Sequence, residues 1–179
     1  FETLQEDWKT PEGFDIDIIT EIAKRLGLKV NFINTSFDGI LGKIGKDYDV
    51  VCSAVTINPT RKKAVLFSTP YITNYQTVVV KKGSDLKINS LKDLDGKSVG
   101  VQKGTTSDQL MSEYKSTKTI NVEVAANDKL LNCFTQLTNG EIDAVVVDST
   151  VADGFVAKNP DKYEKAFSDK TEPEEFGIA

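Results

Sequence analysis

Arg61 is the residue in this chain best suited to hold a carboxylate. The sequence contains 22 Lys+Arg, and reading along it only Arg25 and Arg61 are arginine, so lysine supplies the general surface charge. A guanidinium can bind a carboxylate through two parallel hydrogen bonds, which an ammonium group cannot do. Arg61 follows a polar loop, residues 53–60, that begins where a predicted buried strand ends. This placement indicates a site for a small carboxylate. The alternative is that Arg61 opens a helix at 59–64 and is simply exposed to water.

A second candidate anion site is Gly104-Thr105-Thr106, which opens a predicted helix after the strand at 98–101. The first N–H groups of a helix carry a partial positive charge, and two hydroxyl groups lie beside them here. The spacing is neither that of a P-loop nor GxGxxG. The alternative is an ordinary Ser/Thr N-cap.

Asp148 directly follows the apolar run at 144–147, so its carboxylate is expected at the end of a buried strand, where α/β proteins bind ligands. It could accept hydrogen bonds from an ammonium group, or it could simply cap a helix from Thr150. A cation, a helix N-terminus and a carboxylate together match a zwitterionic α-amino acid. Phe37 stands in a polar setting and could pack on the ligand, although a hydrophobic staple at a helix start is the alternative.

Composition favours binding over catalysis. The chain has no histidine, which removes the commonest general base and the commonest metal ligand, so we predict no enzyme, no metal and no cofactor. The net charge of −5 argues against a nucleic-acid partner. No apolar run approaches the roughly 20 residues needed to span a bilayer, and the polar start at Phe1 is unlike a signal peptide, although a leader or lipid anchor could have been removed. Cys52 and Cys133 are expected to be buried, reduced thiols.

The elements that would position these residues alternate between helix and strand. Asp15 is a plausible N-cap for a helix that ends at Gly27. Helices are further predicted at 37–45, 91–94, 106–115, 128–137 and 150–157, and extended segments at 29–33, 49–55, 75–81, 98–101, 121–124, 144–147 and 175–179. This alternation is typical of largely parallel sheets with right-handed crossovers. We predict two lobes, residues 1–73 and 77–171, with a return crossing at 172–179.

Four segments carry a resemblance to a known family: 13–18, 53–61, 99–106 and 140–148. In order and separation they resemble the family-3 extracellular solute-binding proteins, the polar amino-acid receptors of ABC importers, over essentially the whole chain. The resemblance implies that Arg61 pairs with the ligand carboxylate and that Asp148 binds its ammonium group. It further implies roles for the side chains of Thr56 and Thr106 as donors, for the backbone of Ser53 and Ala54, for Phe37 as a cover, and for Gln102 in side-chain choice. Thr105 joins this set through the helix N-terminus.

The family pattern also has parts with no counterpart in this sequence. A first strand with an aromatic clamp residue would precede the segment matching Phe1, and helices of lobe 1 would follow Ala179. The expected fold is therefore an α/β, two-lobed periplasmic-binding-protein-like (type II) fold lacking those parts. Each lobe would be a mostly parallel sheet flanked by helices, and two hinge strands would join the lobes.

The expected function is capture of an L-amino acid in the cleft between the lobes, for delivery to an ABC transporter membrane permease. The expected location is extracytoplasmic, in the periplasm or as a cell-surface lipoprotein of a Gram-positive bacterium. We expect a monomer that meets the membrane only through the permease or a lipid anchor. The alternatives are a sensor module of a receptor kinase or ligand-gated channel with the same fold, or a dehydratase on this scaffold.

Overall fold

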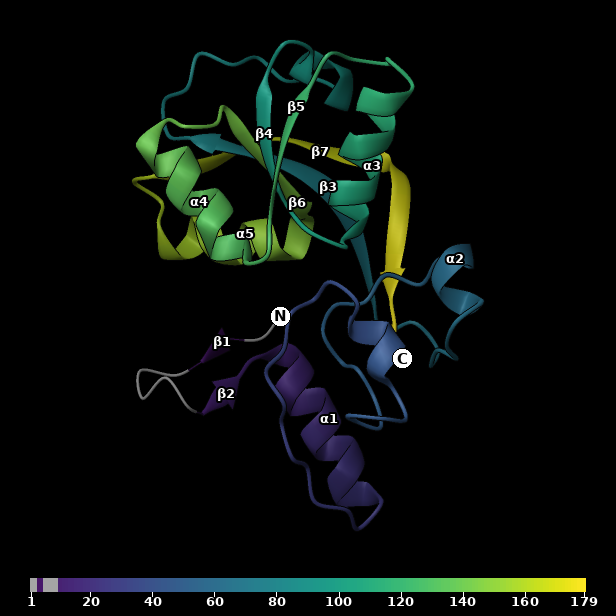
Figure 1. Ribbon diagram of the computed structural model, residues 1–179. Coiled ribbons are helices and arrows are strands. Elements are labelled where there is room, and N and C mark those ends of the chain that lie inside the picture. The colour runs from purple at the N-terminus through teal and green to yellow at the C-terminus, as the bar shows by residue number, and fades with distance from the viewer. Residues whose placement is uncertain (1–2, 5–9) are drawn as a thin grey trace. The chain divides into compact units, whose positions relative to one another are not determined.

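The structure is a computed structural model that describes residues 3–4 and 10–179. The chain forms two compact units: unit 1 comprises Phe1–Thr35, Gly39–Thr73 and Glu174–Ala179, and unit 2 comprises Ser36–Asp38 and Asn74–Pro173. Two long strands, β3 (Ile72–Lys81) and β7 (Tyr163–Phe176), each contain residues of both units (Figure 1). Phe1 and Glu2, at the start of the sequence, lie outside the described residues.

Unit 2 is built on a five-stranded mixed sheet in the order β5-β4-β6-β3-β7. Its inner strands are β4 (Ser98–Gln102), β6 (Ala144–Asp148) and β3, and β5 (Glu123–Asn127) lies at one edge beside β4. β4 runs parallel to both β5 and β6, whereas β3 is antiparallel to β6. The carboxyl ends of β4 and β6 therefore open on the same edge of the sheet, as predicted for a ligand site.

Helices cover both faces of this sheet (Figure 1). One core joins Val78 and Val146 to α3 (Thr106–Ser116) and to the short 3-10 helix η2 (Leu91–Leu94). The other core joins Val79 and Val145 to α4 (Leu130–Asn139) and α5 (Ser149–Lys158). Successive residues of a strand point to opposite faces, so the continuous valine runs of β3 and β6 are explained by burial on both sides.

Unit 1 does not form the predicted parallel sheet within the described residues. It contains the short antiparallel pair β1 (Thr3–Leu4) and β2 (Pro11–Glu12), the helix α1 (Phe14–Arg25), the 3-10 helix η1 (Ile40–Lys43) and the single turn α2 (Pro59–Lys62). The predicted helix at 37–45 is thus reduced to η1. Asp15 is not the N-cap of α1 either, because Gly13 takes that position.

The two segments predicted as strands in unit 1 have different surroundings. The segment at 51–57 bonds to the end of the chain, with hydrogen bonds from Val51 N–H to the Ala179 carbonyl (2.8 Å) and from Gly177 N–H to the Val55 carbonyl (3.0 Å). No backbone hydrogen bond joins residues 29–35 to another described residue. A strand requires a hydrogen-bonded neighbour, so the β-forming sequence of this segment is not enough to make one.

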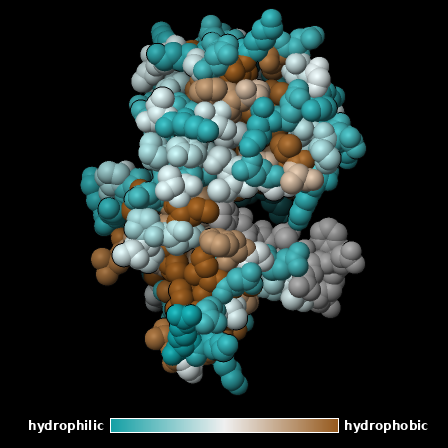
Figure 2. All heavy atoms as spheres, turned by 180° about the vertical axis from the view of Figure 1, so that it is seen from behind, coloured by the Kyte–Doolittle hydropathy of each residue, from teal (hydrophilic) through white to brown (hydrophobic). Residues whose placement is uncertain are grey.

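Apolar side chains gather on the surface of unit 1, where Figure 2 shows brown spheres. Among residues 10–179, the exposed large hydrophobic residues belong to unit 1 with the exception of Leu131, and they are Phe14, Ile22, Leu26, Leu28, Phe32, Ile33, Val50 and Leu66. In the described part of the chain, no helix combines the length and the apolar character needed to cross a membrane.

Candidate functional site

Arg61 is buried rather than exposed to water. It lies in α2, whose first turn is capped by the Asn58 side chain accepting the Arg61 N–H at 2.8 Å. The residue is 8% exposed, and its Nη1 donates to the Thr56 carbonyl at 2.9 Å. The solvent-exposed alternative is therefore wrong: the preceding loop holds the guanidinium in place. The hydroxyl of Thr56 donates to Glu174 Oε2 at 2.8 Å, so both the side chain and the carbonyl of Thr56 are hydrogen-bonded.

The loop before Arg61 is fixed from α1. Asp15 is fully buried in the first turn of α1, and its Oδ2 accepts the N–H of Ala54 at 2.7 Å. Ala54 has a φ of 46°, in the left-handed region. Burial raises the pKa of the Asp15 carboxyl, although the Ala54 N–H and the Tyr71 side chain both favour its charged form. Sequence reasoning assigned Asp15 to a helix cap, whereas the structure places it against the predicted ligand loop.

Asp148 stands at the end of β6 in unit 2, where two amide groups hold its carboxylate. Its Oδ1 accepts from Asn74 Nδ2 at 2.6 Å and from Gln76 Nε2 at 3.2 Å. Asp148 occupies the N-cap position of α5, yet its side chain makes no capping hydrogen bond. Asn74 Oδ1 instead accepts the N–H of Thr150 at 3.3 Å. The alternative reading of Asp148 as a simple helix cap is therefore wrong.

Gln76 connects Asp148 to the start of α3. Its Nε2 also donates to Thr106 Oγ1 at 3.1 Å, and its Oε1 accepts from Ser107 Oγ at 2.6 Å. The structure thus brings Asp148 and Thr106 together around one buried amide. Sequence reasoning missed both Gln76 and Asn74. Their signal was available: two amides at alternate positions, on one face of a strand that is otherwise rich in valine.

The other predicted residues of unit 2 have more local roles. Thr105 is the N-cap of α3: its Oγ1 accepts the N–H of Asp108 at 3.2 Å and donates to the Gln102 carbonyl at 2.7 Å. The N-cap alternative therefore holds for Thr105. The Gln102 side chain donates to the Asp128 carbonyl at 3.3 Å. Phe37 belongs to the short segment that groups with unit 2, although it was expected in lobe 1.

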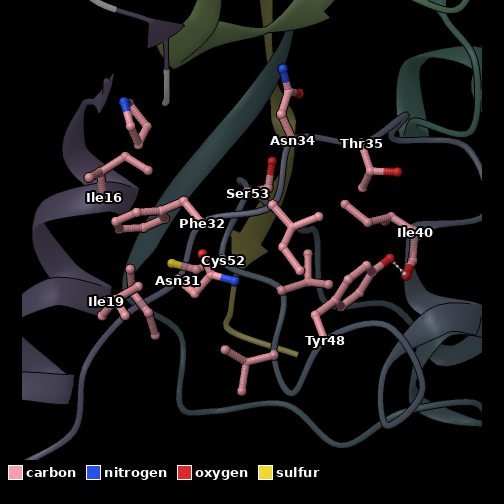
Figure 3. Close-up of a pocket in the computed structure, with 15 residues that line it drawn as sticks. Ile16, Ile19, Asn31, Phe32, Asn34, Thr35, Ile40, Tyr48, Cys52 and Ser53 are labelled. Carbon is pink, nitrogen blue, oxygen red and sulfur yellow. Dashed lines mark hydrogen bonds between the residues drawn. The ribbon is translucent and has the colours of Figure 1, made fainter. Parts of the chain in front are cut away.

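A cavity of about 410 Å³ lies within unit 1, apart from most of the predicted residues. Apolar side chains from α1 and from the two predicted strands line it, and Figure 3 shows Ile16, Ile19 and Phe32 pointing into it. Ser53 lines this cavity, whereas Thr56 and Arg61 do not. The cavity is therefore distinct from the carboxylate site predicted at Arg61.

The two cysteines differ in burial: Cys133 is buried as expected, whereas Cys52 is only half-buried. Cys52 and Cys133 are reduced thiols, and burial raises the pKa of Cys133 to about 11. A thiol with such a pKa is almost entirely protonated at neutral pH and is a poor nucleophile. Among the residues that the structure describes, no group of three His, Cys, Asp or Glu side chains is placed to hold a metal ion.

Comparison with known proteins identifies relatives along the whole chain. Residues 1–117 match the bacterial extracellular solute-binding proteins, family 3, and residues 62–174 match a second family described as NMT1/THI5 like. A probable histidine-binding protein of Campylobacter jejuni is 36% identical over 83% of this chain and 56% of its own length. The ABC transporter arginine-binding protein 1 of Escherichia coli is 33% identical over 92% of this chain and 65% of its own length. The chain thus spans about three fifths of these curated relatives.

Solved structures agree with the sequence matches. The arginine-bound form of truncated ArgBP from T. maritima superposes with a TM-score of 0.89 at 40% identity, covering 99% of this chain and 81% of that one. This agreement confirms the predicted periplasmic-binding-protein-like α/β fold. The profile match over 117 residues, the curated relatives and the superposition show that the chain belongs to the family-3 bacterial extracellular solute-binding proteins.

Proposed function

We propose that this protein binds an L-amino acid outside the cytoplasm and delivers it to the membrane permease of an ABC importer. The support is family membership together with the relatives named as histidine-binding and arginine-binding proteins. We propose a monomer, located in the periplasm or attached by a lipid anchor to the surface of a Gram-positive bacterium.

The observation that carries this proposal is a pair of side chains of opposite charge, each held in place by hydrogen bonds. Arg61 in unit 1 is a buried guanidinium held by the Thr56 carbonyl, and Asp148 in unit 2 is a carboxylate held by two amides. An α-amino acid carries one carboxylate and one ammonium group, so it needs a cation and an anion. Arg61 would bind the carboxylate and Asp148 the ammonium group. The further proposed contacts are the side chains of Phe37, Thr56, Gln102 and Thr106, the backbone of Ser53 and Ala54, and the N-terminus of α3 that Thr105 caps.

The charges of Arg61 and Asp148 would also make the site selective for ligands that carry both a carboxylate and an ammonium group. A ligand that lacks one of the two charges cannot form the ion pair with Arg61 or with Asp148. Breaking a buried ion pair by removing one partner costs about 3–5 kcal/mol, which is roughly two to three and a half orders of magnitude in affinity. We therefore expect the protein to reject analogues that keep the side chain of the amino acid and lose one charge.

The test is a thermal-shift screen of the full-length protein with L-arginine, L-histidine, L-cystine and L-glutamine. A ligand at 100 times its Kd stabilises a protein by about 2.7 kcal/mol, which raises the melting temperature of a chain of this size by roughly 5–10 °C. Agmatine, which is arginine without its carboxylate, and 5-guanidinopentanoate, which is arginine without its ammonium group, serve as controls. No shift with any of the twenty amino acids, cystine or ornithine would remove the proposed function.

Arg61 can be tested directly against the other arginine of the chain. Arg61→Lys keeps the positive charge but loses the two-pronged geometry, so we expect a large loss of affinity for the amino acid in calorimetry. Arg25→Lys is the matched control, because Arg25 is an exposed residue of α1 that pairs with Glu21. Equal affinity of the two variants would show that Arg61 does not bind the carboxylate.

A further inference from the structure

The proposed function leaves one buried charged residue unused. Asp15 belongs to the segment at 13–18 that the sequence comparison singled out, and its side chain is 0% exposed. In a helix N-terminus an aspartate ordinarily binds the N–H groups of its own first turn. Here its Oδ2 accepts the N–H of Ala54 at 2.7 Å, across 39 residues of sequence. The carboxylate therefore holds the loop at 53–56 by a hydrogen bond and does not cap α1.

The partner of Asp15 has an unusual backbone conformation. Ala54 has a φ of 46°, and the other described non-glycine residue with positive φ is Lys118. A side chain in the left-handed region brings its Cβ close to the following carbonyl oxygen, so residues other than glycine seldom adopt it. Such a conformation persists where the surroundings hold it in place. The hydrogen bond from Ala54 to a buried carboxylate is the contact that does so here.

Holding the Ala54 N–H also fixes the direction of the Ser53 carbonyl. No cis peptide bond occurs among the described residues, and in a planar trans peptide the carbonyl points opposite to the following N–H group. Because the Ala54 N–H points at α1, the Ser53 carbonyl points away from it. The other end of the loop is fixed independently, since Val55 and Thr56 carbonyls accept from Gly177 N–H (3.0 Å) and from Arg61 Nη1 (2.9 Å).

We propose that Asp15 is a positioning residue of the ligand site, which holds the Ala54 peptide so that the Ser53 carbonyl accepts a hydrogen bond from the ligand's ammonium group. This inference rests on the proposed function. Asp15 does not itself touch the ligand: it acts through the direction of one peptide group.

Two substitutions of Asp15 separate positioning from packing. Leucine has nearly the shape of aspartate and fits a buried position, but it has no acceptor for the Ala54 N–H. Asparagine keeps an acceptor oxygen and is uncharged. Asp15→Asn should therefore preserve the Ala54 conformation, and Asp15→Leu should release it. Asp17→Asn is the matched control, because Asp17 lies in the same turn of α1 and is exposed.

The first measurement needs no ligand. In the full-length protein, the Cα and Cβ chemical shifts and the amide–Hα coupling of Ala54 report the sign of its φ. We expect the left-handed signature in the wild type, in Asp15→Asn and in Asp17→Asn, and its loss in Asp15→Leu. A left-handed Ala54 in Asp15→Leu would overturn the proposal, whatever the protein binds.

The second measurement is calorimetry with L-arginine, together with a rescue. We expect Asp15→Leu to lose about tenfold or more in affinity and Asp15→Asn to stay within about threefold of the wild type. Ala54→Gly in the Asp15→Leu background should recover at least part of the loss, because glycine adopts positive φ without a Cβ contact. A role in stability alone would change the melting temperature without this rescue of affinity.

The outcomes distinguish the two proposals. If the wild type binds amino acids and Asp15→Leu binds them equally well, the positioning role of Asp15 is wrong and the proposed function stands. If the wild type binds no amino acid, the proposed function is wrong and the positioning role falls with it, even where Ala54 still depends on Asp15 for its conformation.

Discussion

Replacing Asp148 with asparagine should weaken amino-acid binding strongly while leaving the unliganded protein almost unchanged. Asparagine has the same shape as aspartate and keeps one oxygen for the two amides that hold it, Asn74 Nδ2 at 2.6 Å and Gln76 Nε2 at 3.2 Å. The variant loses the charge of this acceptor but neither hydrogen bond. A net hydrogen bond contributes about 0.5–1.5 kcal/mol, so weakening two of them changes the free energy of unfolding by about 1 kcal/mol or less.

The effect on binding is larger, because the ligand's ammonium group would lose its counterion. Truncating one partner of a buried, hydrogen-bonded charge pair costs about 2–5 kcal/mol. At 1.4 kcal/mol per factor of ten, this corresponds to roughly a 30-fold to 4,000-fold increase in Kd. The two magnitudes differ enough that one variant separates a role in binding from a role in stability.

The assay is calorimetry on the full-length protein with L-arginine, or with whichever amino acid gives the largest thermal shift, and a melting curve without ligand. Asp153→Asn is the matched control, since it removes the same charge from α5, the helix that Asp148 precedes, at a residue that pairs with Lys165 on the surface. An exposed pair of this kind contributes about 0–1 kcal/mol to stability. Affinity of Asp148→Asn within about threefold of that of Asp153→Asn would refute the assignment of Asp148 to the ammonium group.

Other predictions concern packing and the two thiols. Gly100→Ala places a Cβ 2.6 Å from Ile142 Cδ1 and 3.1 Å from Cys133 Cβ, so it should destabilise unit 2 by about 1–3 kcal/mol. The new Cβ of Gly154→Ala meets nothing within 4 Å in α5, so this substitution should raise the free energy of unfolding by about 0.5–1 kcal/mol. If denaturant melts showed that Gly100→Ala and Gly154→Ala change this free energy in the same direction, the packing argument would be contradicted. Iodoacetamide at pH 8 should label Cys52 much faster than Cys133, whose pKa is raised by burial to about 11; equal rates of labelling would contradict that burial.

The elements of unit 2 could be predicted from the sequence because each carries its own pattern. The valine runs of β3 and β6 and the apolar stripe of α4 are local signals, and the structure has these elements within about three residues of the prediction. The strand predicted at 29–33 in unit 1 was wrong for the opposite reason. Residues 29–33 have the composition of a strand, but a strand depends on a neighbour that local composition does not report.

The residues of the candidate site also divide into those that a local sequence pattern identifies and those that it does not. Asp148 could be found because a charge at the end of an apolar run stands out, and Arg61 because it is one of two arginines and follows a polar loop at a predicted strand end. The structure holds both side chains by hydrogen bonds. Asn74 and Gln76 were missed because an amide near a strand end resembles ordinary surface polarity until its partners are known. Asp15 was assigned to a helix cap because its true partner, Ala54, is remote in sequence. Contacts between distant segments are the part of a site that local patterns do not contain.

The segment at 29–35 has a consequence for how this chain behaves in solution. Its N–H and C=O groups bond to no other described backbone, and Phe32 and Ile33 beside them are exposed. Exposed β-forming side chains favour the addition of a strand from another chain. Lys29 is the one charged residue of this segment, so electrostatic repulsion does little to prevent such pairing. The exposed apolar side chains of unit 1 therefore favour self-association as the protein concentration rises, whereas the apolar side chains of the unit 2 sheet are buried in its two cores.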